Sequence, residues 1–372
     1  MKVAVISRGI PSIQYPLNGI FEFDQAKALA KAGMEVAFIA IDFRAFSYKR
    51  KCGLFKYERD GVNVFELSLP IGVYRRALPV LQRLLLIPFR AMLKDFGEPD
   101  IIHAHFYSIA AIATILKKKY DIPLVITEHS SKLNKAGDEI SGLDKKIATK
   151  AYNSCDCLIC VSNTLRDNVL RNFNHDSVVI SDMVDNQIYG IREQNKNTSP
   201  FVYVAVGNLV PIKALDKLVE SFAKVNDDAR LVIIGDGPEK ENLQNKINEL
   251  GLDAKVNLMG QLNRQQINEI YQDSNVFVLP SQSETFGVSY IEAMYAGLPV
   301  IATRCGGPES FVDENNGMLV EVNNVDELAE AMRRIRENYN KYNPVQISEI
   351  CREKFALEVV AERIISVYNG FL

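Results

Sequence analysis

The sequence predicts a protein of two α/β domains, each built around a parallel β-sheet, and three observations predict this fold. The chain has 372 residues, enough for two ordinary domains and too many for one small core. Short apolar runs alternate with segments of helical periodicity almost throughout, which is the pattern of repeated βαβ units. A polar stretch at 190–200, GIREQNKNTSP, runs from a glycine to a proline and divides this alternation into two series.

The first series predicts an N-terminal domain at 1–190. The chain starts MKVAVIS, and this apolar run is too short for a signal peptide, so we expect it to form a buried strand. Helices are expected at Glu22–Ala32, with Gly33 as the C-cap, and at Ile109–Lys119. Parallel strands buried on both faces are expected at Val3–Ser7, Val36–Ile41, Ile101–His105, Leu124–Thr127 and Cys157–Val161.

The second series predicts a C-terminal domain at 200–354. Strands are expected at Phe201–Val206, Arg230–Ile234, Val256–Met259, Val276–Leu279, Val300–Ala302 and Gly317–Leu319. Helices are expected at Ala214–Val225, Glu239–Leu250, Arg264–Gln272, Val288–Ala296 and Val325–Glu337. Ligands bind at the carboxyl ends of parallel strands, so we expect the two domains to face each other across one ligand cleft.

Composition and charge narrow the class of protein. Hydrophobic residues make up 47% and charged residues 24%, the balance of a soluble globular protein, and no apolar run is long enough to span a bilayer. The six unevenly placed cysteines suit reduced thiols, which predicts a cytoplasmic location. Residues 1–120 hold 18 Lys and Arg against 10 Asp and Glu. This excess indicates an anionic partner or membrane surface, or only a cluster of solvated lysines, and no nucleic-acid partner is expected.

The segment 280–310, PSQSETFGVSYIEAMYAGLPVIATRCGGPES, has the features of an anion site. A predicted strand ends before Pro280, a polar loop carries Glu284, and a helix starts near Val288. The first amides of a helix have no intrahelical acceptor and, with the helix dipole, favour an anion, while Gly287 allows a ligand close to the backbone. Glu284 and Glu292 would then face one ligand that carries both phosphate and hydroxyl groups. The alternative is a capping acid and a solvated helical glutamate.

This segment resembles the glutamate–seven–glutamate signature of retaining glycosyltransferases of the GT-B fold, the glycogen-synthase and sucrose-synthase-like group called family four. The matching positions are Pro280, Ser281, Glu284, Phe286, Gly287, Glu292, Ala293, Gly297, Pro299, Val300, Gly306 and Gly307. Further resemblances cover nearly the whole chain: Asn18-Gly19-Ile20, Val206-Gly207 with Lys213, Gly235-Asp236-Gly237-Pro238, Val256–Gly260 and a final helix around Phe355–Tyr368. The family's fold is two Rossmann-like domains, and its last helix, here within 355–372, packs back on the N-terminal domain.

The resemblance implies a role for each matching residue. Glu284 would hold the hydroxyls of the donor sugar, helped by the backbone of Phe286, Gly287 and Val288. Glu292 would bind the ribose of the nucleotide. Lys213 would neutralise the diphosphate as its bond to the sugar breaks, and Gly19 would offer its backbone N–H to the same group. A lysine at the start of a helix could instead be solvated.

Two positions depart from the family pattern. The family often has Arg where this chain has Asn208, and Gly where it has Ala214. An asparagine can donate a hydrogen bond to phosphate but supplies no charge. The charge of Lys213 would then matter more, and Arg8, at the end of the first strand, is a candidate to compensate.

Histidines and cysteines complete the set of candidate residues. His129 follows a predicted strand at its ligand edge and matches a family histidine that lies near the donor sugar and the acceptor, whereas His103 and His105 are expected to be hydrogen-bonded core residues. The chain contains no Asp-x-Asp, the metal-binding motif of the other common glycosyltransferase architecture, and no metal or other cofactor is implied. Cys155, Cys157 and Cys160 have no fourth zinc ligand nearby and are better explained as small buried hydrophobes.

The segment Tyr74–Lys94 is amphipathic, with five cations beside an apolar stripe. It would form either a membrane-surface helix near a lipid-linked acceptor or a helix packed on the N-terminal sheet and broken at Pro79 and Pro88.

Together these features predict a glycosyltransferase that moves a hexose-type sugar from a nucleotide-sugar donor to a hydroxyl acceptor with retention of configuration. The acceptor would be a saccharide or a lipid-linked saccharide, in polysaccharide or glycolipid biosynthesis. The alternatives are a nucleotide-sugar epimerase of the same fold, a dinucleotide-dependent oxidoreductase and a non-catalytic sugar-binding module. Ser7-Arg8-Gly9-Ile10-Pro11 after the first strand, in place of Gly-x-Gly-x-x-Gly, counts against the oxidoreductase.

Overall fold

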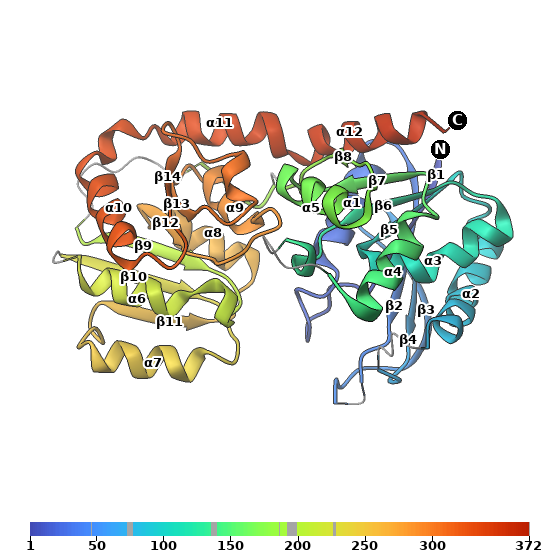
Figure 1. Ribbon diagram of the computed structural model, residues 1–372, viewed down its shortest axis with the longest axis horizontal. Helices are drawn as coiled ribbons and strands as arrows, with labels where there is room; N and C mark the ends of the chain where they lie inside the picture. Colours follow the sequence, from blue (N-terminus) through green and yellow to red (C-terminus); the bar gives the residue numbers. More distant parts are fainter. Residues whose placement is uncertain are drawn as a thin grey trace. The chain divides into compact units, whose positions relative to one another are not determined.

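The computed structural model divides the chain into two compact units, which we describe one at a time. The first unit contains residues 1–183 and 357–372, and the second contains 184–356. The structure describes residues 1–45, 47–72, 77–134, 140–185, 187–191, 199–225 and 228–371. Figure 1 labels the helices and strands of both units.

The first unit is built on an eight-stranded sheet with the strand order β3-β4-β2-β1-β5-β6-β7-β8. Its strands are β1 (Lys2–Ser7), β2 (Glu35–Asp42), β3 (Gly53–Arg59), β4 (Val62–Ser68), β5 (Ile101–His105), β6 (Leu124–Glu128), β7 (Cys157–Cys160) and β8 (Val178–Val179). Its helices are α1 (Ile20–Lys31), α2 (Leu78–Asp95), α3 (Phe106–Tyr120), α4 (Gly142–Tyr152), α5 (Asn163–Phe173) and α12 (Leu357–Asn369). The five strands predicted for this part of the chain are therefore confirmed to within a residue or two at their ends.

One strand pair corrects the prediction that this sheet is wholly parallel. β3 and β4 are antiparallel, whereas the other strand pairs described in the sheet are parallel. The two are joined by Asp60 and Gly61, both with positive φ, at 54° and 77°. An Asp-Gly pair favours this tight hairpin turn, so the turn signal was present in the sequence. The exposed face of β3 gave it too few apolar residues to be recognised as a strand.

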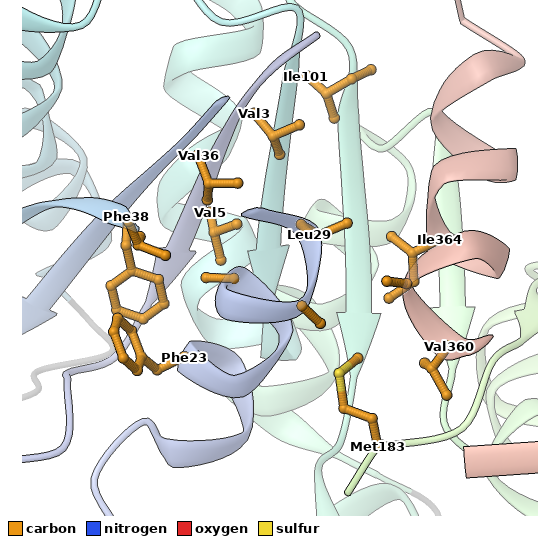
Figure 2. Packing of buried hydrophobic residues seen from close by; sticks show 14 of the residues in the cluster. Val3, Val5, Phe23, Leu29, Val36, Phe38, Ile101, Met183, Val360 and Ile364 are labelled. Carbon is orange, nitrogen blue, oxygen red and sulfur yellow. The ribbon is translucent and has the colours of Figure 1, made fainter. Parts of the chain in front are cut away.

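The core of the first unit lies between the sheet and helices α1 and α12, which pack side by side. Val3 and Val5 of β1 alternate with residues on the other face, so they meet Leu29 of α1 and Ile364 of α12 (Figure 2). The final helix thus contributes apolar side chains to the first unit, although it follows the second unit in the sequence.

Most of the amphipathic segment 74–94 forms helix α2. It buries Leu81, Leu85, Phe89 and Met92, and it packs against α3 and β4. The expected break at Pro88 is wrong, because the helix runs through this buried proline. Packing of the surrounding apolar side chains offsets the hydrogen bond that proline cannot donate. Residues 74–76 lie outside the described residues.

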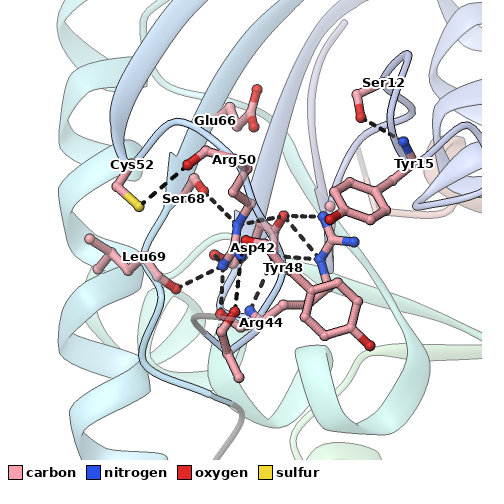
Figure 3. Close-up of polar contacts among 12 residues, drawn as sticks. Ser12, Tyr15, Asp42, Arg44, Tyr48, Arg50, Cys52, Glu66, Ser68 and Leu69 are labelled. Carbon is pink, nitrogen blue, oxygen red and sulfur yellow. Dashed lines mark hydrogen bonds and ion pairs between the residues drawn. The ribbon is translucent and has the colours of Figure 1, made fainter.

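A polar network fixes the loop that follows β2 (Figure 3). The Arg50 guanidinium donates to the backbone carbonyls of Asp42, Arg44 and Leu69 and, through Nε, to Ser68 Oγ at 2.9 Å. Arg44 pairs with the Asp42 carboxylate, and its guanidinium carbon lies 4.1 Å from the centre of the Tyr15 ring. These contacts hold Arg44 and Arg50 at the carboxyl edge of the sheet.

The second unit is built on a six-stranded, wholly parallel sheet with the order β11-β10-β9-β12-β13-β14. Its strands are β9 (Phe201–Val206), β10 (Ala229–Ile234), β11 (Val256–Gly260), β12 (Val276–Leu279), β13 (Val300–Thr303) and β14 (Gly317–Val320). Its helices are α6 (Leu215–Ala223), α7 (Lys240–Glu249), α8 (Arg264–Gln272), α9 (Val288–Tyr295), α10 (Val325–Glu337) and α11 (Pro344–Phe355). The predicted strand and helix series of this region is confirmed, with α11 in addition.

Across the residues described, no helix is both long enough and apolar enough to cross a membrane.

Candidate active site

Glu284 and Lys213 meet at the carboxyl edge of the second sheet. Glu284 lies in the loop after β12. Its backbone is held on both sides, because its N–H donates to Cys305 O and its carbonyl accepts from Gly307 N at 2.9 Å. Its Oε1 atom lies 2.5 Å from Lys213 Nζ and accepts from Ser281 Oγ at 2.7 Å. Both side chains are largely buried, with 20% of Lys213 and 11% of Glu284 exposed. The two residues that the family resemblance singles out are thus one ion pair.

Lys213 is positioned by the loop after β9. It ends a single 3₁₀ turn, Pro211–Lys213, and Ala214 follows in the left-handed conformation with φ 48°. A Cβ built on Gly207 would lie 3.7 Å from Lys213 Cε, so the lysine stem lies along this glycine. Asn208, the departure from the family pattern, is exposed on the same loop. Gly235 packs closely against the same loop, since a Cβ built on it would lie 1.9 Å from Gly207 O.

The start of α9 lies directly after the Glu284 loop. Gly287 precedes the helix in a left-handed conformation with φ 102°, which a residue with a Cβ rarely adopts. Phe286 is buried against Phe311 and Phe355, and this anchors the turn. Val288 is the first helical residue, so its amide belongs to the helix end that favours an anion.

Glu292 lies inside α9 and is 8% exposed. Its Oε1 lies 3.5 Å from Nε of Arg264, the first residue of α8. The buried Tyr189 hydroxyl also lies near this carboxylate, and burial together with the Glu292 charge raises the pKa of Tyr189. The structure thus gives Glu292 a cationic and a phenolic neighbour that the sequence did not suggest.

The remaining predicted site residues belong to the first unit. Gly19 precedes α1 with φ 72°, and a Cβ there would lie 2.2 Å from Gly9 O, so the loop requires glycine. Arg8 follows β1, and its guanidinium carbon lies 4.3 Å from the centre of the Phe106 ring. Its Nε lies 3.6 Å from Oε1 of the buried Glu22. These residues share the carboxyl edge of the first sheet.

His129 follows β6 at this edge, with both ring nitrogens in contact with protein groups. Nδ1 lies 3.1 Å from Asp182 Oδ1, and Nε2 lies 3.0 Å from His105 Nδ1. The ring also packs on Phe106, with 5.1 Å between ring centres. Burial opposes protonation, but the charge and proximity of Asp182, with help from Glu22 and Glu128, raise the pKa of His129. The resemblance predicted the position of this histidine but not its partners.

His103 and His105 are the buried core residues that the sequence predicts. His103 contacts Gln25 and Tyr368 through Nδ1 and Thr127 through Nε2, and burial lowers its pKa to about 3. The His105 ring stacks on the His103 ring at 5.0 Å, and burial likewise lowers the pKa of His105. Both rings are therefore neutral near pH 7.

Three acidic residues beside His129 were missed at the sequence level. Glu128 accepts from the amides of Tyr107, His129 and Ser130 and from the Tyr152 hydroxyl. Glu22 could have been suspected from its place three residues after Gly19, at the start of a helix. Asp182 gave no signal, since it lies in a loop with no recognisable motif.

Of the three cysteines expected to be small buried hydrophobes, Cys160 is buried, whereas Cys155 and Cys157 are partly exposed. Cys157 and Cys160 lie on β7, and burial raises the pKa of the Cys155 and Cys160 thiols to about 12. Within the described part of the chain, no group of three or more His, Cys, Asp and Glu side chains is placed to hold a metal ion.

Two protein-family models match the chain in succession. Residues 23–187 match "Glycosyltransferase Family 4", and residues 190–348 match "Glycosyl transferases group 1". The chain belongs to glycosyltransferase family 4. A similar curated protein is TuaC of Bacillus subtilis, a glycosyltransferase assigned to teichuronic acid biosynthesis, with 27% identity over 356 residues that cover 90% of this chain and 89% of TuaC.

Solved structures agree with this family at the level of fold. Sucrose-phosphate synthase from Thermosynechococcus elongatus has a TM-score of 0.81 at 20% identity, over 100% of this chain and 98% of that chain. Anabaena HepE, solved with UDP and glucose, has a TM-score of 0.74 at 19% identity, over 100% of both chains. The GT-B fold predicted from the sequence is therefore confirmed, and this family 4 member is a glycosyltransferase.

Proposed function

We propose that this glycosyltransferase moves a hexose-type sugar from a nucleoside-diphosphate sugar to a hydroxyl acceptor, with retention of the anomeric configuration. One observation carries the proposal. The Lys213–Glu284 ion pair joins the loop after β9 to the loop after β12, and the second of these loops leads to the start of α9, where Gly287 opens the backbone to a ligand. A cation, a carboxylate and a helix N-terminus in one place suit a ligand that has both phosphates and sugar hydroxyls.

Each group then has a distinct task toward the donor. Lys213 and the first amides of α9 stabilise the negative charge that grows on the diphosphate as the sugar leaves. Glu284 accepts hydrogen bonds from sugar hydroxyls, next to the backbone of Phe286, Gly287 and Val288. Glu292 accepts from the ribose. The complexes of Anabaena HepE with UDP and glucose and with UDP-glucose support this choice of donor class.

The proposed reaction is a displacement on one face of the sugar. The acceptor oxygen bonds to the anomeric carbon on the face from which the diphosphate departs, and a diphosphate oxygen takes the acceptor proton. No side chain needs to act as a nucleophile. We expect no metal requirement, because Lys213 and the helix end supply positive charge at the diphosphate. Activity that disappears with EDTA and returns with Mg²⁺ would contradict this expectation.

The acceptor is proposed to be a saccharide or a lipid-linked saccharide reached at a membrane surface. The exposed side of α2 supports a peripheral contact, since a single stripe at helical spacing carries Val80, Arg83, Ile87, Arg90 and Lys94. Such a stripe suits an anionic bilayer. Co-sedimentation with phosphatidylglycerol vesicles should fall in Arg83→Glu/Arg90→Glu, and equal binding of both proteins would remove this part of the proposal.

The central test is a thermal-shift panel of nucleoside diphosphates and their sugars. A ligand that binds only the folded state raises the melting temperature in proportion to its affinity. NMR of the product with the best donor then reads the anomeric configuration, and NMR of the donor incubated alone separates transfer from epimerisation. If no nucleotide raises the melting temperature, the proposed donor class is wrong.

A further inference from the structure

The Arg44 guanidinium lies in the loop after β2, at the carboxyl edge of the first sheet, and the protein itself holds it in place. Its Nε donates to both carboxylate oxygens of Asp42, at 2.9 and 3.2 Å, and its Nη2 donates to Asp42 Oδ2 at 2.6 Å. These bonds occupy the edge of the planar group that Nε and Nη2 form. Because the side chain is already ordered, binding a ligand there costs little further conformational entropy.

The opposite edge of the Arg44 guanidinium faces no protein acceptor. A guanidinium has five N–H donors, and the edge formed by Nη1 and Nη2 carries two of them side by side. Nη1 has no hydrogen-bond partner among the residues that the structure describes, and 22% of the side chain is exposed (Figure 3). Two parallel N–H groups match two oxygens of a carboxylate or a phosphate, so this edge can bind one oxyanion through two hydrogen bonds.

The charges around Asp42 also favour an anion. Its carboxylate is shared by Arg44 and by Arg50, whose Nε lies 3.1 Å from Asp42 Oδ2. Arg50 is only 9% exposed and donates to three backbone carbonyls, so it serves the structure of the loop. Two guanidinium groups against one carboxylate leave this group with a net positive charge. The exposed Lys49 and Lys51 flank Arg50 in the sequence and have the same sign.

Two tyrosine rings adjoin the same guanidinium. Its central carbon lies 4.1 Å from the centre of the Tyr15 ring and 5.0 Å from the centre of the Tyr48 ring, and the two ring centres are 5.8 Å apart. Tyr15 is fixed by a turn of the loop after β1, where its N–H donates to Ser12 O and Ser12 Oγ. The Tyr48 ring is 44% exposed. A tyrosine ring offers an apolar face with a polar tip, which suits the C–H face and the hydroxyls of a sugar.

We propose that Arg44, Tyr15 and Tyr48 form a subsite for an acidic sugar, in which the Nη1–Nη2 edge of Arg44 binds a carboxylate or phosphate group and the Tyr48 ring packs on the sugar. The binding of such a sugar rests on the contacts within the first unit. Its identity as part of the acceptor rests on the proposed function, and it narrows the acceptor from any saccharide to one that carries an oxyanion.

Ligand-observed NMR titrations with three probes test the subsite. Methyl glucuronide, glucose 6-phosphate and methyl glucoside present a carboxylate, a phosphate and neither group on a glucose-type ring. UDP is present throughout, so that the phosphate probe does not enter the proposed diphosphate site. The unsubstituted protein should bind at least one acidic probe about tenfold or more tightly than methyl glucoside, the usual gain from a charged, bidentate hydrogen bond. The tighter acidic probe identifies the oxyanion.

Variants assign this preference to the named side chains. Arg44→Gln should remove the preference, and Arg44→Lys should keep only part of it, because lysine has the charge but not the planar fork. Tyr48→Ala should weaken binding of the acidic probe by about 2- to 10-fold. Arg166→Gln removes the same charge from an exposed arginine of the first unit that pairs with Asp167, and it should leave the three affinities unchanged.

Three results would overturn the proposal. Acidic probes that bind the unsubstituted protein no better than methyl glucoside would do so without any variant. A preference that persists in folded Arg44→Gln would show that another cation binds the oxyanion. Unchanged affinity in Tyr48→Ala, whose exposed ring can be removed even if Arg44→Gln fails to fold, would exclude packing on the tyrosine. Absence of UDP binding would contradict the proposed donor class alone, and the preference for an acidic probe would still stand.

Discussion

Lys213 Nζ lies 2.5 Å from Glu284 Oε1, and this ion pair joins the loop after β9 to the loop after β12. Glu284 is also held by Ser281 and by its own backbone contacts. It therefore fixes the position of the Lys213 ammonium group. Removing one partner of a largely buried pair leaves the other charge uncompensated. The two residues should therefore behave as one unit in catalysis.

Substitution of either partner should abolish most of the activity. We expect Lys213→Ala and Glu284→Gln each to lower kcat by about 100-fold or more, the usual cost of losing a charge-stabilising group. The double variant should lose little more than either single one, because the residues act together. Lys224→Ala, which breaks the exposed pair with Asp326, is the control and should keep full activity. Fully additive losses in the double variant would contradict a joint role.

Gly307 offers a test of the backbone that presents the donor site. A Cβ on this residue would lie 2.2 Å from the carbonyl oxygen of Phe286, so Gly307→Ala must displace the turn that precedes α9. We expect a loss of about 1–3 kcal/mol in stability, as for other overpacked sites. Donor affinity measured by calorimetry should fall as well.

The matched control for Gly307 is Gly190. A Cβ there meets nothing within 4 Å, so Gly190→Ala should change stability by no more than about 0.5 kcal/mol. Equal donor affinity in Gly307→Ala and Gly190→Ala would show that the Phe286 turn does not present the donor.

Regular periodicity explains how much of the fold could be predicted from the sequence. Buried parallel strands such as Val276–Leu279 are continuous apolar runs, and their bounds could be predicted almost to the residue. Strand β3 alternates partly buried and exposed residues and has no such run. Helices α4 and α5 were missed because their buried residues are few and are separated by many charged or polar ones. The physical signal was weak where one face of an element meets water.

The candidate site could likewise be predicted only in part. Glu284, Gly287 and Glu292 are close in sequence, so one loop and one helix suffice to predict their placement. The Asp182–His129 contact instead depends on the order of strands β6, β7 and β8, which brings distant segments together. For the same reason Arg264, the first residue of α8, meets Glu292 of α9. Contacts of this kind follow from topology, which a single sequence specifies only indirectly.

Helix α2 provides a test of packing against exposure on one element. Leu85 is fully buried between α2 and its neighbours, so Leu85→Ala should cost about 2–5 kcal/mol of unfolding free energy. Val80 is 53% exposed on the opposite stripe, and Val80→Ala should cost no more than about 0.5 kcal/mol. Chemical denaturation of both variants checks the comparison. Similar losses for the two would mean that the helix does not pack as the structure has it.

The buried histidines predict a fall in stability at mildly acidic pH. His103 has a pKa of about 3 in the folded protein because it is buried, whereas an unfolded chain has a histidine pKa of about 6.5. Between these values the unfolded state binds more protons, so the free energy of unfolding decreases as pH falls through this window. His105, whose pKa is also lowered, acts in the same direction. The stability contributed by a neutral His103 is fully present above about pH 6.5.

Comparison of His103→Asn with the unsubstituted protein isolates the contribution of His103. Glu128 has a raised pKa from burial and acts with the opposite sign, and His129 acts above about pH 6.5, so the raw slope mixes several groups. We therefore expect His103→Asn to have a shallower decline of unfolding free energy than the unsubstituted protein between about pH 5 and 6.5. The difference approaches about 1.4 kcal/mol per pH unit for a single proton. Urea denaturation at intervals across this window measures both slopes. Parallel slopes would show that His103 is already protonated in the folded protein, in spite of its contacts with Gln25, Thr127 and Tyr368.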